Sequence, residues 1–334
     1  MRALVYTADR TLDVLDVALP VVRDDEVLVR VERAGICGSD VQGVATRSPR
    51  RAPPLIMGHE LIGEVTSGPT VPRALRGLRV AVNPQIPCGR CLACRSGLEN
   101  ICQRRELVGG NRPGGFGEFV AVPARCLHVI SGELPAAVAV LTEPVATCIH
   151  AFRLFPSPLP ETVVVLGAGT IGTLACIVAR IFGAGRIIVS EANAERRTAA
   201  ASIADLAVPP DELEQHVSAT GGAPLTVDAV GSSLTRATSV KLLGPGGLAL
   251  WLGMHDLEAT VPAFELVVRE QAIRGSFAYT DADFARAVEV LTQHRAAFRI
   301  ATTTCSLDEG ARLFGELVAG QLDGTLKIAL DPGL

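Results

Sequence analysis

A strand, a glycine-rich loop and a helix in direct succession most restrict the fold of this 334-residue chain. The apolar run TVVVL at 162–166 is typical of a strand buried on both faces of a parallel sheet. It leads into GAGTIG, where Gly167, Gly169 and Gly172 have the spacing G-x-G-x-x-G, and then into a helical pattern at 170–181. The first glycine permits a tight turn, the second lets a phosphate approach the backbone, and the third lets helix and strand pack closely. The sequence therefore predicts a dinucleotide-binding loop.

The residues after this loop repeat the alternation of strand and helix. Apolar runs at 186–190, 225–230 and 247–253 are separated by stretches with helical patterns. Such alternation builds a parallel sheet with helices on both faces. We therefore expect a doubly wound α/β domain, with the pyrophosphate at the N-terminus of the helix that begins at Thr170 and Ile171.

An acidic residue at the end of the second strand indicates which dinucleotide binds. Glu191 follows RIIVS, and a carboxylate at that position accepts the hydroxyls of the adenosine ribose and repels a 2′-phosphate. The sequence therefore favours NAD over NADP. Arg196 and Arg197 oppose this interpretation, because either guanidinium could reach a 2′-phosphate.

The segments on either side of this domain have a different pattern. In the run at 26–36, three valines alternate with other side chains, which is the period of a half-buried strand. Similar short runs separated by Gly and Pro indicate a β-rich barrel or sandwich. Two amphipathic helical runs at 281–293 and 308–320 and a last strand at 326–330 follow the doubly wound region.

Four closely spaced cysteines predict a structural metal site. Cys88, Cys91, Cys94 and Cys102 form C-x2-C-x2-C-x7-C, and four thiolates can complete a tetrahedral zinc shell. A ferredoxin-type iron–sulfur cluster also begins with C-x2-C-x2-C, but its next cysteine follows after three residues and precedes a proline. Zinc is therefore favoured, and because four protein ligands leave no open position, we interpret the site as structural.

A metal that takes part in chemistry needs an open position, and a second group of residues offers one. Its members are Cys37, Ser39 and Asp40 in GICGSD, His59 and Glu60 in MGHE, and Glu143 in LTEPVA. Taken singly, a buried Cys or His is more often a core residue than a ligand. Glu143, however, lies in an apolar stretch, where an unpaired carboxylate is costly unless a cation neutralises it.

Composition excludes several other classes of protein. The chain has 31 Lys and Arg against 35 Asp and Glu, without runs of like charge, so we expect no nucleic-acid or membrane partner. Every long apolar stretch is interrupted by charges or prolines, and the N-terminus has no apolar signal core. Nine cysteines then indicate metal or thiol chemistry in the reducing cytoplasm rather than disulfides.

The order of these signals resembles the zinc-dependent medium-chain alcohol dehydrogenases, and within them the polyol branch of sorbitol, butanediol and threonine dehydrogenases. The matching motifs cover nearly the whole chain: GICGSD, MGHE, the four-cysteine segment, GGFGEFVAVP, a Glu-Pro and GAGTIG. The resemblance implies a GroES-like catalytic domain at 1–149 and 277–334, and a Rossmann NAD-binding domain at 150–276, with the active site between them. It also implies a homodimer or homotetramer with a small-molecule substrate.

The resemblance assigns the ligands of the catalytic zinc position by position. Cys37 and His59 match two ligands, and Glu60 matches the third ligand of the polyol type. Glu143 matches an acid that binds the metal or its water; the ethanol-oxidising branch has a cysteine there. Which of the two glutamates contacts the metal directly is left open.

The resemblance also implies a route for the proton and the hydride. Ser39 matches the hydroxyl that takes the substrate proton, and Asp40 the carboxylate that orients the ligand histidine. Many relatives have a histidine where this chain has Gln42, so the exit of the proton is open. The implied reaction transfers hydride from a secondary alcohol, polyol or sugar derivative to NAD, with zinc as a Lewis acid. The residues expected to flank the nicotinamide are Val230, Gly231, Leu252, Gly253, Ser276 and Phe277.

Two other functions are alternatives, and the first of them would use the same residues. A redox-neutral sugar epimerase or lyase would oxidise a carbon transiently with bound NAD and then return the hydride. A non-catalytic, zinc-stabilised binding scaffold is less favoured, because it would need only the closed four-cysteine site.

A cluster of arginines bears on the substrate. Arg47, Arg50 and Arg51 precede MGHE, and Arg112 lies in NRPGG. Exposed arginines are ordinary surface residues. A guanidinium also suits bidentate recognition of a phosphate or carboxylate, so an anionic substrate is an alternative to a neutral polyol.

Overall fold

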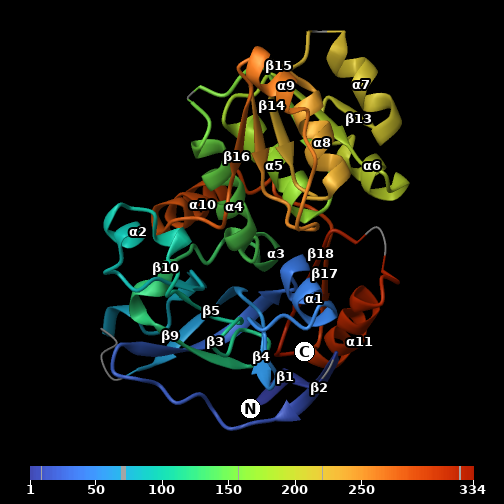
Figure 1. The fold of residues 1–334 in the computed structure, drawn as a ribbon. Coiled ribbons are helices and arrows are strands. Elements are labelled where there is room, and N and C mark those ends of the chain that lie inside the picture. The colour runs from blue at the N-terminus through green and yellow to red at the C-terminus, as the bar shows by residue number, and fades with distance from the viewer. Residues whose placement is uncertain (9, 69–72, 157, 220, 323–324) are drawn as a thin grey trace. The chain divides into compact units, whose positions relative to one another are not determined.

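The computed structural model describes residues 1–8, 10–68, 73–156, 158–219, 221–322 and 325–334, which form two compact units (Figure 1). The first unit comprises Met1–Glu143 and Thr280–Leu334, and the second comprises Pro144–Tyr279. The division falls within helix α4 (Thr142–Arg153). The predicted fold class is confirmed: one unit is rich in β-strands, and the other contains a parallel, doubly wound sheet.

The described residues of the first unit form three sheets. The largest has the strand order β10 (Leu127–Val129), β6 (Arg79–Val82), β5 (Glu60–Ser67), β3 (Glu26–Gly35), β18 (Lys327–Leu330), β17 (Thr302–Cys305), and β9 (Phe119–Pro123) also pairs with β3. A second sheet has the order β2 (Thr11–Asp16), β1 (Arg2–Ala8), β4 (Leu55–Ile56), and a third pairs β7 (Gln85–Ile86) with β8 (Glu106–Leu107).

The helices of this unit are α1 (Gly38–Ala45), α2 (Leu92–Arg95), α3 (Ala136–Ala139), α10 (Asp281–Gln293) and α11 (Leu307–Val318). The last two are the amphipathic runs expected from the sequence. Thr280 caps α10 by accepting a hydrogen bond from the backbone of Asp283, and Ser306 caps α11 by accepting one from Glu309.

The core of the first unit joins residues from both ends of the chain. Val27, Val29 and Val31 of β3 are buried, as their alternation predicts. Phe314 of α11 is fully buried and meets Phe116 edge to face, with ring centroids 6.5 Å apart. Strand β18, red in Figure 1, pairs antiparallel with the blue strand β3. The C-terminal segment therefore completes the β-rich unit.

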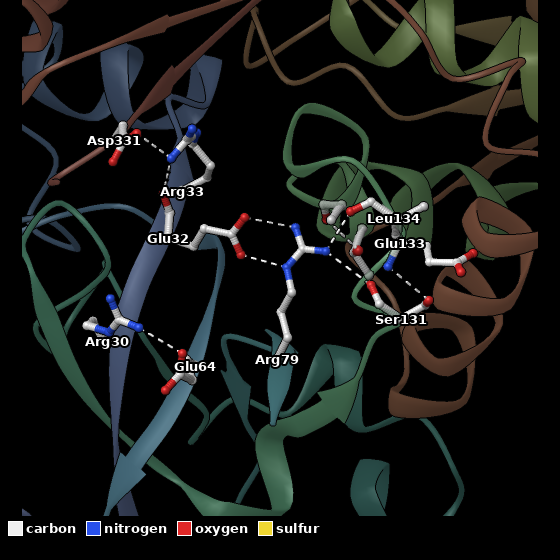
Figure 2. A network of polar contacts seen from close by, with 11 residues as sticks. Arg30, Glu32, Arg33, Glu64, Arg79, Ser131, Glu133, Leu134 and Asp331 are labelled. Atoms are coloured by element: carbon white, nitrogen blue, oxygen red, sulfur yellow. Dashed lines mark hydrogen bonds and ion pairs between the residues drawn. The ribbon is translucent and has the colours of Figure 1, made fainter. Parts of the chain in front are cut away.

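The face of β3 away from this core carries ionic contacts (Figure 2). Arg79 of β6 donates from Nε and Nη2 to the two carboxylate oxygens of Glu32, at 2.6 and 2.9 Å. Its Nη1 donates to the carbonyls of Ser131 and Leu134. One guanidinium thus links β3 and β6 to the segment after β10.

The second unit is a six-stranded parallel sheet flanked by helices (Figure 1). Its strand order is β13 (Leu206–Val208), β12 (Arg186–Ser190), β11 (Thr162–Leu166), β14 (Ala223–Asp228), β15 (Leu243–Trp251), β16 (Ala272–Gly275). Besides most of α4, its helices are α5 (Thr170–Ile181), α6 (Ala194–Ala200), α7 (Pro210–Ser218), α8 (Ser233–Lys241) and α9 (Ala263–Val268). The first strand of this sheet along the chain is β11, at its centre. The strand order reverses between β11 and β14, and doubly wound sheets bind ligands at such a point.

No helix among the described residues is long and apolar enough to cross a membrane.

Substitution of Phe314 by alanine tests the role of the C-terminal segment. The substitution leaves a cavity in a fully buried site, so we expect a loss of about 3–5 kcal/mol in the free energy of unfolding. Denaturant unfolding followed by circular dichroism measures it, with Val21→Ala, whose residue is 89% exposed, as the control. Equal midpoints for both variants would show that α11 does not stabilise the core.

Candidate active site

The motif GICGSD forms the turn from β3 into α1. The Cys37 sulfur accepts hydrogen bonds from the Ser39 backbone N–H at 3.5 Å and from the Ser39 hydroxyl at 3.3 Å. The Asp40 carboxylate accepts one from the Cys37 backbone N–H at 3.4 Å. This reciprocal capping at the start of α1 holds the three predicted side chains together.

Two further predicted ligands lie at the start of β5. Glu60 pairs with Gly35 in the register of β3 and β5, and His59 precedes it. Cys37, His59 and Glu60 each offer one ligand atom, and these atoms lie within 4.8 Å of one another. Zinc holds such ligands at about 2.0–2.3 Å, so donors around one ion lie close together, as they do here. Three protein donors leave a fourth position open.

The charges around His59 fit a cation. Nδ1 of the ring lies 3.2 Å from Asp40 Oδ1, and both side chains are buried. Burial favours the neutral ring, but Asp40 and Cys37 more than offset this and raise the pKa of His59 well above its usual value. Burial likewise opposes ionised Asp40, yet His59 and Arg51 hold the pKa of that carboxyl below its usual value. Negative groups that favour a proton on the ring also favour a metal ion in its place.

One buried cation at this site is marked by no sequence motif. Lys327 of β18 forms an ion pair with Glu60 and donates to the Ile36 carbonyl at 3.0 Å. Burial lowers the pKa of Lys327, but the charges of Glu60 and Cys37 outweigh it, so that the pKa is raised. Most of the chain separates Glu60 from Lys327. The pairing of β18 with β3 brings the two residues together.

Glu143 lies in the first turn of α4 and outside the group of three donors. Its charge nevertheless contributes to raising the pKa of Lys327, so the carboxylate is within electrostatic range of the group. The choice between Glu60 and Glu143 as a direct ligand stays a prediction.

The four predicted cysteine ligands converge. Sulfur–sulfur distances are 3.4 Å for Cys91 and Cys94, 3.8 Å for Cys91 and Cys102, and 4.0 Å for Cys88 and Cys94. Backbone N–H groups of Arg90 and Cys91 lower the pKa of Cys88 to about 6. Four sulfurs at these separations fit the tetrahedral shell of a single zinc ion.

The glycine-rich loop has the geometry of a phosphate site. Gly167 has a φ of +91°, which other residues rarely adopt. A Cβ on Gly172 would overlap the Gly167 carbonyl oxygen, whereas a Cβ on Gly169 would meet nothing within 4 Å. The N-cap residue of α5 is Gly169, which has no side chain to cap the helix, and the start of a helix, here at Thr170 and Ile171, suits an anionic group.

Glu191 is buried at the end of β12 and braces this loop. Its Oε2 accepts from the Ala168 backbone N–H at 2.7 Å, and its Oε1 from that of Asn193 at 2.9 Å. Arg197 donates to the backbone carbonyl of Glu191 at 2.8 Å. Arg196 lies in the first turn of α6, and its N–H donates to the Asn193 side chain.

The remaining residues predicted to bind the cofactor follow the carboxyl ends of β14, β15 and β16. They are Val230, Gly231, Leu252, Gly253, Ser276 and Phe277. Asp228 Oδ1 accepts from the N–H groups of the first two, both at 2.9 Å. The Ser276 hydroxyl oxygen is buried without a hydrogen-bond partner among the described residues. This edge of the sheet is where doubly wound folds bind dinucleotides.

Two of the arginines considered as anion ligands lie against acidic side chains of the chain itself. Arg51 contacts Asp40 and Ser39, and Arg112 pairs with Glu26 and Glu106. An anionic substrate stays a prediction.

Two family models match the chain. The alcohol dehydrogenase GroES-like domain matches residues 23–132, and the zinc-binding dehydrogenase model matches residues 170–293. They cover the parts of the chain that carry the metal-site motifs and the glycine loop.

Individual proteins are similar over most of the chain. The L-galactonate-5-dehydrogenase of Escherichia coli K12 is 30% identical over 282 residues, 82% of each chain. The D-xylulose reductase A of Aspergillus oryzae is 29% identical over 334 residues, 95% of this chain and 93% of that protein. A crystal structure of a protein assigned as a zinc-binding dehydrogenase, from Sinorhizobium meliloti 1021 with bound NADP, has a TM-score of 0.91 and 29% identity over 99% of both chains.

These similarities agree with the metal-site motifs and the doubly wound sheet, and the resemblance noted in the sequence is confirmed. The chain therefore belongs to the zinc-dependent medium-chain dehydrogenases of the polyol type, oxidoreductases that use a nicotinamide cofactor.

Proposed function

We propose that this protein oxidises a secondary alcohol, polyol or sugar derivative to a ketone and transfers the hydride to NAD. The observation that carries the proposal is the convergence of Cys37, His59 and Glu60 into a three-donor group with an open position. A protein that used zinc only for stability would need the four-cysteine site alone. The names of the relatives, a galactonate dehydrogenase and a xylulose reductase, support a substrate of the polyol or sugar-acid class.

The metal site divides the work among a few side chains. Cys37 and His59 would hold zinc, with Glu60 or Glu143 as the further ligand, and zinc there would polarise the alcohol oxygen as a Lewis acid. Asp40, beside Nδ1 of His59, fixes the orientation of the ring. The Ser39 hydroxyl, bonded to the Cys37 sulfur, would accept the proton that leaves the substrate.

We propose NAD as the cofactor and assign it to the doubly wound domain at 150–276. The open side of Gly169 and the glycine N-cap of α5 suit the pyrophosphate, and Glu191 suits the adenosine ribose. NAD supplies the hydride acceptor, and the residues after β14, β15 and β16 would flank its nicotinamide. The domain at 1–149 and 277–334 would supply both metal sites.

We also propose that the protein is a cytoplasmic homodimer or homotetramer. Strand β16 forms one edge of the parallel sheet, and α9 exposes Phe264, Val267 and Val268. An edge strand beside exposed apolar side chains favours pairing with another copy. Thiols with metal-binding or core positions suit a reducing compartment.

A panel of secondary alcohols, polyols, sugar acids and sugar phosphates tests the reaction. NADH absorbance should rise in proportion to the ketone formed for at least one member of the panel. A product formed without net NADH would support the epimerase or lyase alternative and contradict the proposal.

Two metal sites with different roles predict two zinc ions per chain. Cys91→Ser should lose the structural zinc and lower the melting temperature, because the metal contributes to folding. Cys37→Ser should lose the other zinc and the activity, with little change in melting temperature. Metal analysis, calorimetry and kinetics check this, with Cys176→Ala in buried α5 as the control that keeps both ions. One zinc per wild-type chain would contradict the prediction.

The carboxylate of Glu191 predicts that kcat/KM is at least about tenfold higher with NAD than with NADP. Glu191→Gln removes the charge but keeps an oxygen that can accept from Ala168 N–H, so the ratio should fall towards one. Glu195→Gln, in exposed α6, is the control and should keep the ratio. Steady-state kinetics with both cofactors decides; equal use of NADP by the wild type would overturn the assignment.

The position of Ser39 predicts that Ser39→Ala lowers kcat by about 100-fold or more, because the first proton acceptor is lost. Zinc content should not change, since the hydroxyl is not a ligand. Ser48→Ala, on the loop after α1, is the matched control. A near-native kcat for Ser39→Ala would place the first proton acceptor elsewhere.

A further inference from the structure

Arg51 reaches from the loop after α1 back to the residues at the start of that helix. Its Nε donates to Asp40 Oδ1 at 3.0 Å, and its Nη2 donates to Ser39 Oγ at 3.1 Å. Only 11% of its side chain is exposed, and the Asp40 side chain is fully buried. The neighbouring Arg50 is exposed. Arg51 is therefore part of the interior of the site rather than of the surface.

Helix α1 leaves a path open for this side chain. A Cβ on Gly43 would lie 2.7 Å from Cδ of Arg51 and 3.5 Å from its Nε and Nη1. Gly43 does not have a positive φ, so its backbone conformation does not require glycine. Glycine within a helix is less favourable than alanine. The absence of a side chain at Gly43 thus leaves the space through which Arg51 crosses the helix.

The chemistry of the guanidinium fixes the direction of these bonds. Arginine has five N–H donors and no acceptor, and it stays charged in proteins. Ser39 Oγ is therefore the acceptor from Arg51, and its own hydrogen must point to another acceptor. The Cys37 sulfur, 3.3 Å away, is that acceptor. Without Arg51 the hydroxyl would be free to rotate away from Cys37.

We propose that Arg51 is a positioning residue for the alcohol oxidation, a step that rests on the proposed function above. Nη2 of Arg51 holds the Ser39 hydroxyl, and Nε holds Asp40, which in turn lies against His59. The oxygen of Ser39 keeps one lone pair for the substrate hydroxyl. When Ser39 accepts the substrate proton, its own hydrogen leaves the Cys37 sulfur and passes to a water molecule; Arg51, already fully protonated, is not its acceptor.

A double-mutant cycle separates this role from simple bracing. Arg51→Met should lower kcat by about tenfold while KM changes less than about threefold. In a Ser39→Ala background, Arg51→Met should lower kcat by about twofold or less, because the hydroxyl that Arg51 positions is absent. Loss of the Asp40 contact occurs in both backgrounds and cancels. Equal factors in the two backgrounds would overturn the proposal.

A second variant leaves Arg51 in place. Gly43→Ala puts a methyl group on the path of the arginine and should lower kcat in the same direction as Arg51→Met. Arg10→Met is the control, because Arg10 also donates a hydrogen bond to α1, but to the carbonyl of Ala45 at the last residue of the helix, whereas Ser39 lies in its first turn. A native kcat for Gly43→Ala together with a native kcat for Arg51→Met would refute the proposal.

Thermal unfolding of the metal-containing protein gives a readout that does not depend on activity. The fall in melting temperature caused by Arg51→Met should be about 2 °C smaller in the Ser39→Ala background, because one hydrogen bond is already lost there. Strictly additive falls would show that the Arg51–Ser39 bond is absent in solution. If the wild type oxidises nothing in the substrate panel, the proposed function fails, while this cycle still decides whether Arg51 holds Ser39.

Discussion

The pairing of β3 with β5 is the constraint on which the metal site depends. Cys37 follows the end of β3, and His59 and Glu60 stand at the start of β5, so their antiparallel register brings residues from two separate motifs together. Strand β18 joins the other side of β3 and adds Lys327. There is no room between the strands: a Cβ on Gly35 would lie 2.7 Å from Cε of Lys327 and would overlap the Glu60 carboxylate. A one-residue shift of any of these strands would dismantle the group.

Buried charges in this group are neutralised by specific partners. Lys327 faces Glu60, and Arg51 faces Asp40, so each buried acid has a fixed cation. An unpaired buried carboxylate would be costly, and paired ones are tolerated only where the geometry and hydrogen bonds are good. Of the two acidic donors, Glu60 has Lys327 as its cation, and the Cys37 thiol has no ion pair of its own among the described contacts. A dication bound there would keep net positive charge at the open position, which favours loss of a proton from an alcohol.

Local patterns were sufficient to predict the fold class, the four-cysteine segment and the glycine loop. In each of these the residues that act together lie within a few positions of one another, so their spacing reports their geometry. Contacts that depend on distant pairing left no such signal: Lys327 reads as an ordinary strand residue. In the sequence, Arg51 is indistinguishable from its neighbours Arg47 and Arg50, because the sequence does not show that Arg51 crosses α1 at Gly43. The short edge strands β13 and β16 leave no clear pattern in the sequence for a related reason, since three or four residues carry too little periodicity.

The second unit places two demands on one carboxylate. Both oxygens of Glu191 already accept backbone N–H groups, from Ala168 in the glycine loop and from Asn193 before α6. A carboxylate has about four acceptor sites, so it can bind ribose hydroxyls while it keeps these bonds, and its orientation is fixed before a ligand arrives. The fold alone does not select the cofactor, because the similar protein from Sinorhizobium meliloti was solved with NADP. In the proposed assignment, selection depends on the charge at position 191, whereas bracing of the loop depends on the carboxylate oxygens. Gln at this position would lose the charge but keep one oxygen that can accept from the Ala168 N–H. Cofactor preference and loop stability can therefore change independently.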